Sequence, residues 1–204
     1  RNDMDGVPGL TQSPIGPDAE FVYEFTVPDP GTYFVHPHAG VQTDHGLYAP
    51  LVVEDPQEPG AYDVDQVVVL DDWTDGVGED PDTILRRLLS DGHSMGGMSG
   101  MGMGGMSGSQ GDRQLSPLGR DTGDVAYPYY LANGRIPTAP QVTRANPGQR
   151  VRLRLVNAGS DTAFRVGIGG HRMTVTHTDG FPVRPVDVAT LLVAMGERYD
   201  VLVA

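Results

Sequence analysis

Residues 31 to 55 read GTYFVHPHAGVQTDHGLYAPLVVED, in which two strand-like runs flank a segment rich in turn-forming residues. We expect strands over 32–38 and 47–55, and the first of these ends in His36-Pro37-His38. Side chains two residues apart on a strand point to the same side, about 6.5 to 7 Å apart. Both histidines should therefore face one way. Pro37 donates no backbone hydrogen bond, which favours the end of a strand or an irregular edge at this point.

A single His-x-His pair has two interpretations. It can be an accident of surface composition, which is common when the pair stands alone. It can also bind metal, and its spacing is wide for chelating one ion but suits two ions a few ångströms apart, with one imidazole on each. Imidazole serves both zinc and copper, so the pair does not choose the metal by its chemistry.

Strand-like segments recur along the chain and predict an all-β protein with many turns, consistent with its 28 Gly and 17 Pro. Residues 20–27 alternate apolar and polar side chains and predict a hairpin with 32–38. In 150–157, Val, Leu and Arg alternate in the manner of a strand at the edge of a sandwich. Further strands are expected at 64–73, 127–131, 163–168, 171–178, 186–193 and 198–203.

A Pro-rich stretch at 56–63 is the best candidate for a domain boundary. It divides the chain into an N-terminal part, 1–57, and a second domain, 58–204. One helix is expected in the second part: Asp80 can cap it, Pro81 suits its first turn, and an apolar stripe follows that ends near Gly92.

The segment 93–111 that follows this helix is rich in Gly, Ser and Met, and it predicts a flexible surface loop. Thioethers are soft ligands that favour Cu(I), and a Gly-Ser backbone would let several of them converge on one ion. The competing interpretation is drift in a low-complexity linker. The five methionines concerned are Met95, Met98, Met101, Met103 and Met106.

Composition excludes several classes of function. A net charge of −13 argues against a nucleic-acid binder, which needs a basic face, and suits cations instead. The sequence has no Cys, so it has neither disulfides nor thiolate metal ligands. No apolar run is long enough to span a membrane. No signal peptide is recognisable, and both ends are abrupt, as expected for an internal fragment of a longer protein.

Several motifs together resemble the multicopper oxidases, which include the laccases. GTYFVHPH followed by GLYAPLVVED resembles the second copper-binding motif of that family, and MDGVPGLTQSPI resembles the segment after its first motif. YLANGRIP and GERYDVLV resemble parts of the second cupredoxin domain. The resemblance therefore spans nearly the whole chain, apart from the Met-rich segment. It implies two cupredoxin-like Greek-key β-barrels, the first of them incomplete.

The resemblance implies roles for a few residues. His36 and His38 match the ligands that go one to each ion of the binuclear type 3 copper pair, within a trinuclear type 2/type 3 cluster. Asp5 matches an acidic residue that assists proton transfer to reduced oxygen, although an Asp before Gly is also common in turns. The first His-x-His-Gly, the His-x-x-His-x-His and the His-Cys-His motifs are absent, so the type 1 copper belongs outside this chain. The fragment alone is expected to be inactive.

Related enzymes of other architecture fit less well. Copper nitrite reductases place their type 1 cysteine where this chain has Pro37. Two-domain laccases stay possible, but in many of them the second domain holds a type 1 site. Residues 58–204 resemble instead the copper-free middle domain of a three-domain enzyme.

The implied function is oxidation of phenols or of metal ions such as Cu(I), coupled to the four-electron reduction of O₂ to water. The implied partners are O₂, a reducing substrate and the remaining cupredoxin domain, with secretion or another extracytoplasmic location. The competing function is a copper-binding or copper-resistance module without oxidase activity.

The other histidines receive simpler roles: His45 and His171 at the surface and His177 in the core or an interface. The pairs Glu54-Asp55 and Asp71-Asp72 are expected at solvated strand ends.

Overall fold

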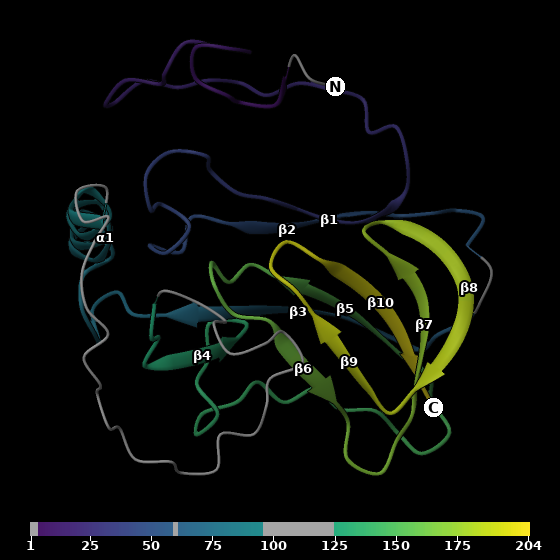
Figure 1. Ribbon diagram of the computed structural model, residues 1–204. Helices are drawn as coiled ribbons and strands as arrows, with labels where there is room; N and C mark the ends of the chain where they lie inside the picture. Colours follow the sequence, from purple (N-terminus) through teal and green to yellow (C-terminus); the bar gives the residue numbers. More distant parts are fainter. Residues whose placement is uncertain (1–3, 59–60, 96–124) are drawn as a thin grey trace, which may run out of the picture.

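The computed structural model describes residues 4–58, 61–95 and 125–204 and shows ten strands and one helix in this part of the chain (Figure 1). In chain order the elements are β1 (Gly31–Val35), β2 (Ala49–Val53), β3 (Val64–Trp73), α1 (Pro81–Met95), β4 (Tyr129–Ala132), β5 (Val151–Asn157), β6 (Phe164–Gly167), β7 (Met173–Thr178), β8 (Phe181–Val188), β9 (Thr190–Val193) and β10 (Arg198–Val203). The predicted all-β class with one short helix is confirmed.

Three sheets organise the described residues. β1 and β2 form an antiparallel pair in which Gly31 lies opposite Val53 and Val35 opposite Ala49. The largest sheet has six strands in the order β4-β3-β5-β10-β7-β8, with β3 parallel to β5 and the other pairings antiparallel. β6 and β9 form a second two-stranded sheet.

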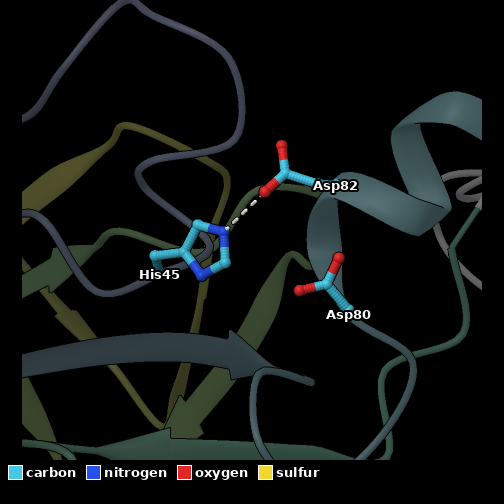
Figure 2. A group of neighbouring side chains, drawn as sticks. All are labelled: His45, Asp80 and Asp82. Atoms are coloured by element: carbon cyan, nitrogen blue, oxygen red, sulfur yellow. Dashed lines mark hydrogen bonds and ion pairs between the residues drawn. The ribbon is translucent and has the colours of Figure 1, made fainter.

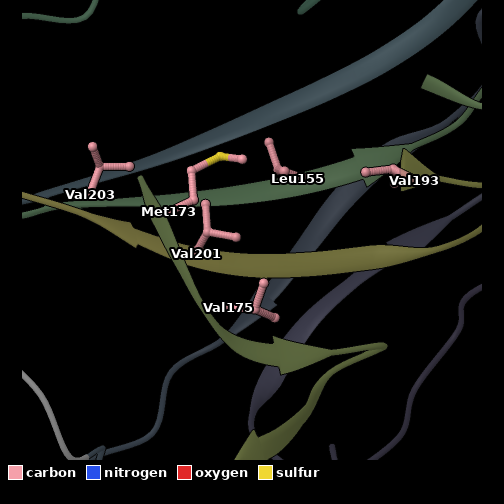
Figure 3. Packing of buried hydrophobic residues seen from close by; sticks show 6 residues of the cluster. All are labelled: Leu155, Met173, Val175, Val193, Val201 and Val203. Carbon is pink, nitrogen blue, oxygen red and sulfur yellow. The ribbon is translucent and has the colours of Figure 1, made fainter. Parts of the chain in front are cut away.

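The main core lies between the β6–β9 pair and the six-stranded sheet. Figure 3 shows its buried side chains around β5, β7 and β10. They are Leu155, Met173, Val175, Val193, Val201 and Val203. Since Val193 comes from β9 and the others from the larger sheet, the arrangement is a sandwich of two layers.

Helix α1 begins as the sequence predicts. The Asp80 carboxylate accepts a hydrogen bond from the backbone N–H of Thr83 at 3.0 Å, which is N-cap geometry, and Pro81 is the first helical residue. The helix continues to Met95, three residues beyond the expected end at Gly92. No helix in the described ranges has the combination of length and hydropathy required to cross a membrane.

Two predictions about strands were wrong. Residues 20–27 form no strand: their apolar residues Phe21, Tyr23, Phe25 and Val27 are 40–45% exposed, and β1 pairs with β2 instead. Alternation favours an extended backbone, but a strand also needs a hydrogen-bonded neighbour, which this segment lacks among the described residues. Likewise β5 is not an edge strand, because β3 and β10 flank it on both sides.

Candidate metal centre

His36 and His38 lie just beyond the end of β1, where the chain leaves the β1–β2 pair. Their ring centroids are 4.7 Å apart, and both side chains are exposed. The predicted same-side orientation is therefore observed, although the strand ends at Val35 rather than at His38. Pro37 accounts for the early end, since it cannot donate to a strand ladder.

The ring nitrogens of both histidines are available to a ligand. Among the described residues, none donates to or accepts from either ring in a hydrogen bond or ion pair. Two adjacent, uncommitted imidazoles are a donor set that suits copper. The residues present thus fit two ligands of a larger copper site.

Phe34 lies under this pair. Its ring is stacked on the His36 ring, with centroids 4.8 Å apart and planes inclined by 16°. Phe34 also packs against a buried cluster of three residues. These are Val69 on β3, Val156 on β5 and Ala158, which directly follows β5. Thr32, Phe34 and His36 therefore lead from buried to exposed positions along one side of the strand.

Buried charges tie the start of β1 to β5 and β10. The Thr32 hydroxyl donates to Asp200 at 2.7 Å and accepts from Arg154 at 3.0 Å, while Arg152 donates to Asp200 at 2.5 Å. These four side chains are at most 3% exposed. Arg152 also pairs with Glu58. Burial lowers the pKa of Arg152, but hydrogen bonds to Asp200 and Glu58 outweigh this effect and raise it above its ordinary value.

Gly31 permits this close approach. A Cβ at this position would lie 2.3 Å from the backbone oxygen of Gly180, in the turn between β7 and β8. The Gly-Thr that opens the strand therefore serves packing against the six-stranded sheet: Gly31 lets the backbones meet, and Thr32 supplies the buried hydroxyl.

A second set of contacts joins the segment after the histidines to β3 and to the segment before β4. The Tyr48 hydroxyl donates to Asp71 at 2.5 Å, and the Tyr127 hydroxyl donates to Asp44 at 2.7 Å.

Burial raises the pKa of Asp71 to about 6, helped by the neighbouring charge of Asp72. Asp71 and Asp72 are 2% and 1% exposed, so the prediction that they are solvated was wrong. Asp72 accepts two backbone N–H groups, those of Ser160 and Asp161, which explains how it can be buried.

His45 also lies at the surface, as predicted, but it is not without contacts. Its two ring nitrogens lie 3.0 Å from Asp75 and 3.3 Å from Asp82. Figure 2 shows Asp82 pointing toward the ring, with Asp80 at the start of α1. Atoms of His45, Asp80 and Asp82 come within 4.8 Å of one another. Hydrogen bonds to Asp75 and Asp82 raise the pKa of His45, and its protonated ring would form ion pairs with both carboxylates.

Asp5 and the five methionines are the remaining predicted site residues. Asp5 is exposed in the N-terminal segment, and it has no hydrogen bond or ion pair with His36 or His38 in the described ranges. Met95 is the last residue of α1, and Met98, Met101, Met103 and Met106 lie outside the described residues. His171 is exposed and His177 is half-buried, 3.8 Å from Asp200.

Sequence reasoning missed the buried ion pairs altogether. Arg152 and Arg154 alternate with apolar residues along β5, a pattern that predicts a solvated face. Both are 2–3% exposed, because Asp200, Glu58 and Asp65 pair with them. The acidic partner was visible in the sequence, since Asp200 sits among apolar residues in the last strand.

Comparison with known proteins matches two parts of the chain to one family. Family models described as multicopper oxidase match residues 1–58 and 65–204. The multicopper oxidase MmcO of Mycobacterium tuberculosis is 53% identical over the whole chain, which spans 39% of that protein. A copper resistance protein A homologue of Pseudomonas syringae pv. tomato is 37% identical over 98% of the chain and 36% of its own length.

A solved structure shows the same architecture. The crystal structure of Fet3p, a multicopper oxidase that functions in iron import, aligns with a TM-score of 0.77 and 25% identity, over 98% of this chain and 32% of its own. The predicted cupredoxin-like fold is thereby confirmed. The chain spans well under half the length of these relatives.

Proposed function

Because the chain belongs to the multicopper oxidase family, we propose that its full-length protein couples one-electron oxidation of a reducing substrate to the four-electron reduction of O₂ to water. The observation that supports this proposal best is the pair of neighbouring imidazoles whose ring nitrogens have no partner among the described residues. Phenolic compounds and metal ions such as Cu(I) are the proposed substrates.

His36 and His38 would hold one copper ion each of a type 3 pair, in a trinuclear cluster completed by ligands from elsewhere in the protein. Copper bound there supplies one-electron redox chemistry at a site open to O₂. The histidines would contribute nitrogen donors from exposed positions just beyond the end of β1. The type 1 copper, which needs a thiolate, belongs outside this chain, since the chain has no cysteine.

Asp5 is proposed to assist proton delivery to the reduced oxygen. Its carboxylate is exposed, which leaves it free to exchange protons with water and with the cluster in the assembled protein. Residues 1–57 would belong to the first cupredoxin domain and 58–204 to a copper-free second domain, with activity outside the cytoplasm.

Capture of Cu(I) by the Met-rich segment is a second part of the proposal. Five methionines within twelve residues offer soft thioether ligands. One relative is named as a copper resistance protein, which agrees with a copper-handling role for this segment.

Alanine variants of the full-length protein test the copper assignment. His36→Ala and His38→Ala should each reduce the copper bound per molecule, measured by metal analysis, and abolish O₂ uptake with a phenolic reductant. His171→Ala is the matched control: it is an exposed histidine whose ring contacts the Ala204 carbonyl at 3.2 Å. Wild-type copper content and O₂ uptake in both cluster variants would refute the assignment. Copper binding without O₂ uptake in the wild type would favour a copper-binding module.

A further inference from the structure

We infer that Phe34 is a positioning residue for the His36 imidazole, and that residues 64–204 orient the proposed type 3 copper ligands His36 and His38 through it without supplying either of them. This inference rests on the proposed function of His36 and His38. The part of the chain that follows the proposed domain boundary would thus help to orient the copper ligands.

The first observation is the geometry of the stack. An inclination of 16° and a centroid distance of 4.8 Å place the imidazole nearly flat on the Phe34 ring. In contrast, the His36 and His38 rings are inclined by 37° to each other. The Phe34 ring therefore sets the plane of one imidazole, and the second imidazole contacts the first at an angle.

The second observation is that Phe34 is itself held in place from the other side. It packs against Val69 on β3, Val156 on β5 and Ala158, which is 4% exposed. The Arg198 guanidinium of β10 lies 5.9 Å from the centre of the Phe34 ring, within cation–π range. Three separate segments of the second part of the chain thus limit the movement of this ring.

The third observation concerns what else could orient His36. A metal-ligating histidine is normally fixed by a hydrogen bond from its other ring nitrogen to a carboxylate, carbonyl or water. The described residues offer His36 no such partner. The flat contact with Phe34 restrains rotation of the imidazole, and it leaves both ring nitrogens accessible.

The consequence is mechanical. Along β1, the buried Thr32 is bonded to β5 and β10, Phe34 is packed on β3 and β5, and His36 is stacked on Phe34. A shift of the six-stranded sheet relative to β1 would therefore tilt the ligand ring. Residues 64–204 act as the support on which the ligand pair is aligned.

The test uses the full-length, copper-loaded protein and compares Phe34→Leu with Phe34→Tyr. Leu keeps the apolar contact but removes the flat ring, whereas Tyr keeps the ring. The measurement is the rate at which copper is lost to a chelator in excess. Aromatic stacking contributes modestly, so Phe34→Leu should lose copper about 2- to 10-fold faster than wild type, with Phe34→Tyr close to wild type.

The matched control is Phe164→Leu, which removes an edge-to-face aromatic pair with Tyr130, 6.0 Å between centroids, away from the histidines. It should lower thermal stability without changing the rate of copper loss. Phe34→Met, which fills the same space with a flexible side chain, replaces Phe34→Leu if the latter fails to fold.

Equal rates of copper loss in Phe34→Leu and wild type would overturn the inference, as would an equal acceleration by Phe164→Leu. A different result would refute the proposed function instead: a His36→Ala variant with the copper content of wild type would show that His36 holds no copper. The two failures are therefore distinguishable in one set of proteins.

Discussion

Replacing Asp200 by Asn tests whether the buried ion pairs hold β1 on the six-stranded sheet. Asp200 is 1% exposed and lies 2.5 Å from Arg152 and 3.5 Å from Arg154, while it accepts the Thr32 hydroxyl at 2.7 Å. Asn keeps the shape and one acceptor oxygen but removes the charge. Two buried guanidinium groups would then lose the carboxylate that they share.

The size of the effect follows from this loss. Breaking a buried ion pair by neutralising one partner costs about 3 to 5 kcal/mol, because the other charge stays buried without compensation. Arg152 already has a buried Nε with no hydrogen-bond partner, so it depends on its two carboxylate contacts. Arg154 is less affected because Asp65 also pairs with it, at 2.8 Å. We therefore expect the lower end of the range, about 3 kcal/mol.

Hydrogen exchange of the full-length protein, followed by mass spectrometry, measures the loss of local stability in Asp200→Asn. A loss of about 3 kcal/mol in the opening free energy should accelerate exchange in peptides covering β5 and β10 by roughly 100-fold. The matched control is Asp187→Asn on β8, whose carboxylate accepts the Thr174 hydroxyl at 2.6 Å in an exposed position. Its effect should stay below about 5-fold. An acceleration by Asp200→Asn no larger than that of the control would refute the reasoning.

Three further predictions follow from other contacts. The folded state keeps the Asp71 proton up to about pH 6, above the usual carboxyl range. The contribution of Asp71 to the free energy of unfolding should therefore fall by about 2 to 3 kcal/mol as the pH rises from 4 to 6. Thermal unfolding of Asp71→Asn should not show this pH dependence. His45 has a raised pKa, so its ion pairs should stabilise the first turn of α1 below pH 6.5 and lose this effect as the pH rises through the raised pKa. The hydrogen-exchange protection factors of this turn, which exclude the intrinsic pH dependence of exchange, should fall with rising pH in the wild type and not in His45→Gln. Deleting residues 94–107 should lower the rate of Cu(I) oxidation and spare phenol oxidation, and equal loss of both rates would contradict a Cu(I) role for the segment.

The backbone pattern around the histidines was predictable because it is local. Strand-forming residues before His36, the proline between the histidines and the cap at Asp80 each act within a few residues, and the structure agrees with the sequence there. The stacking of His36 on Phe34 is also a consequence of positions two apart on one strand.

Contacts between distant segments were not predictable in the same way. Arg154 and Asp71 look solvated because charged residues usually are, and their burial depends on partners 89 and 23 residues away. Residues 20–27 show the opposite error, since their alternation is correct for a strand but no neighbour pairs with them in the described part of the chain. Both the burial of a charged residue and the formation of a strand depend on partners that lie far along the chain.

The bond between Thr32 and Asp200 spans 168 residues, and this has a consequence for biosynthesis. The strand that leads to the histidines emerges from the ribosome first, but its buried partner is among the last residues of this chain to be made. At roughly 5 to 20 residues per second, the interval is on the order of 10 to 30 s. During this time β1 can pair with β2 and pack on β3 and β5 but lacks its contacts with β10, so the histidine pair should reach its final alignment only after β10 has been synthesised. Productive metal loading at His36 and His38 should accordingly follow the synthesis of β10 rather than precede it.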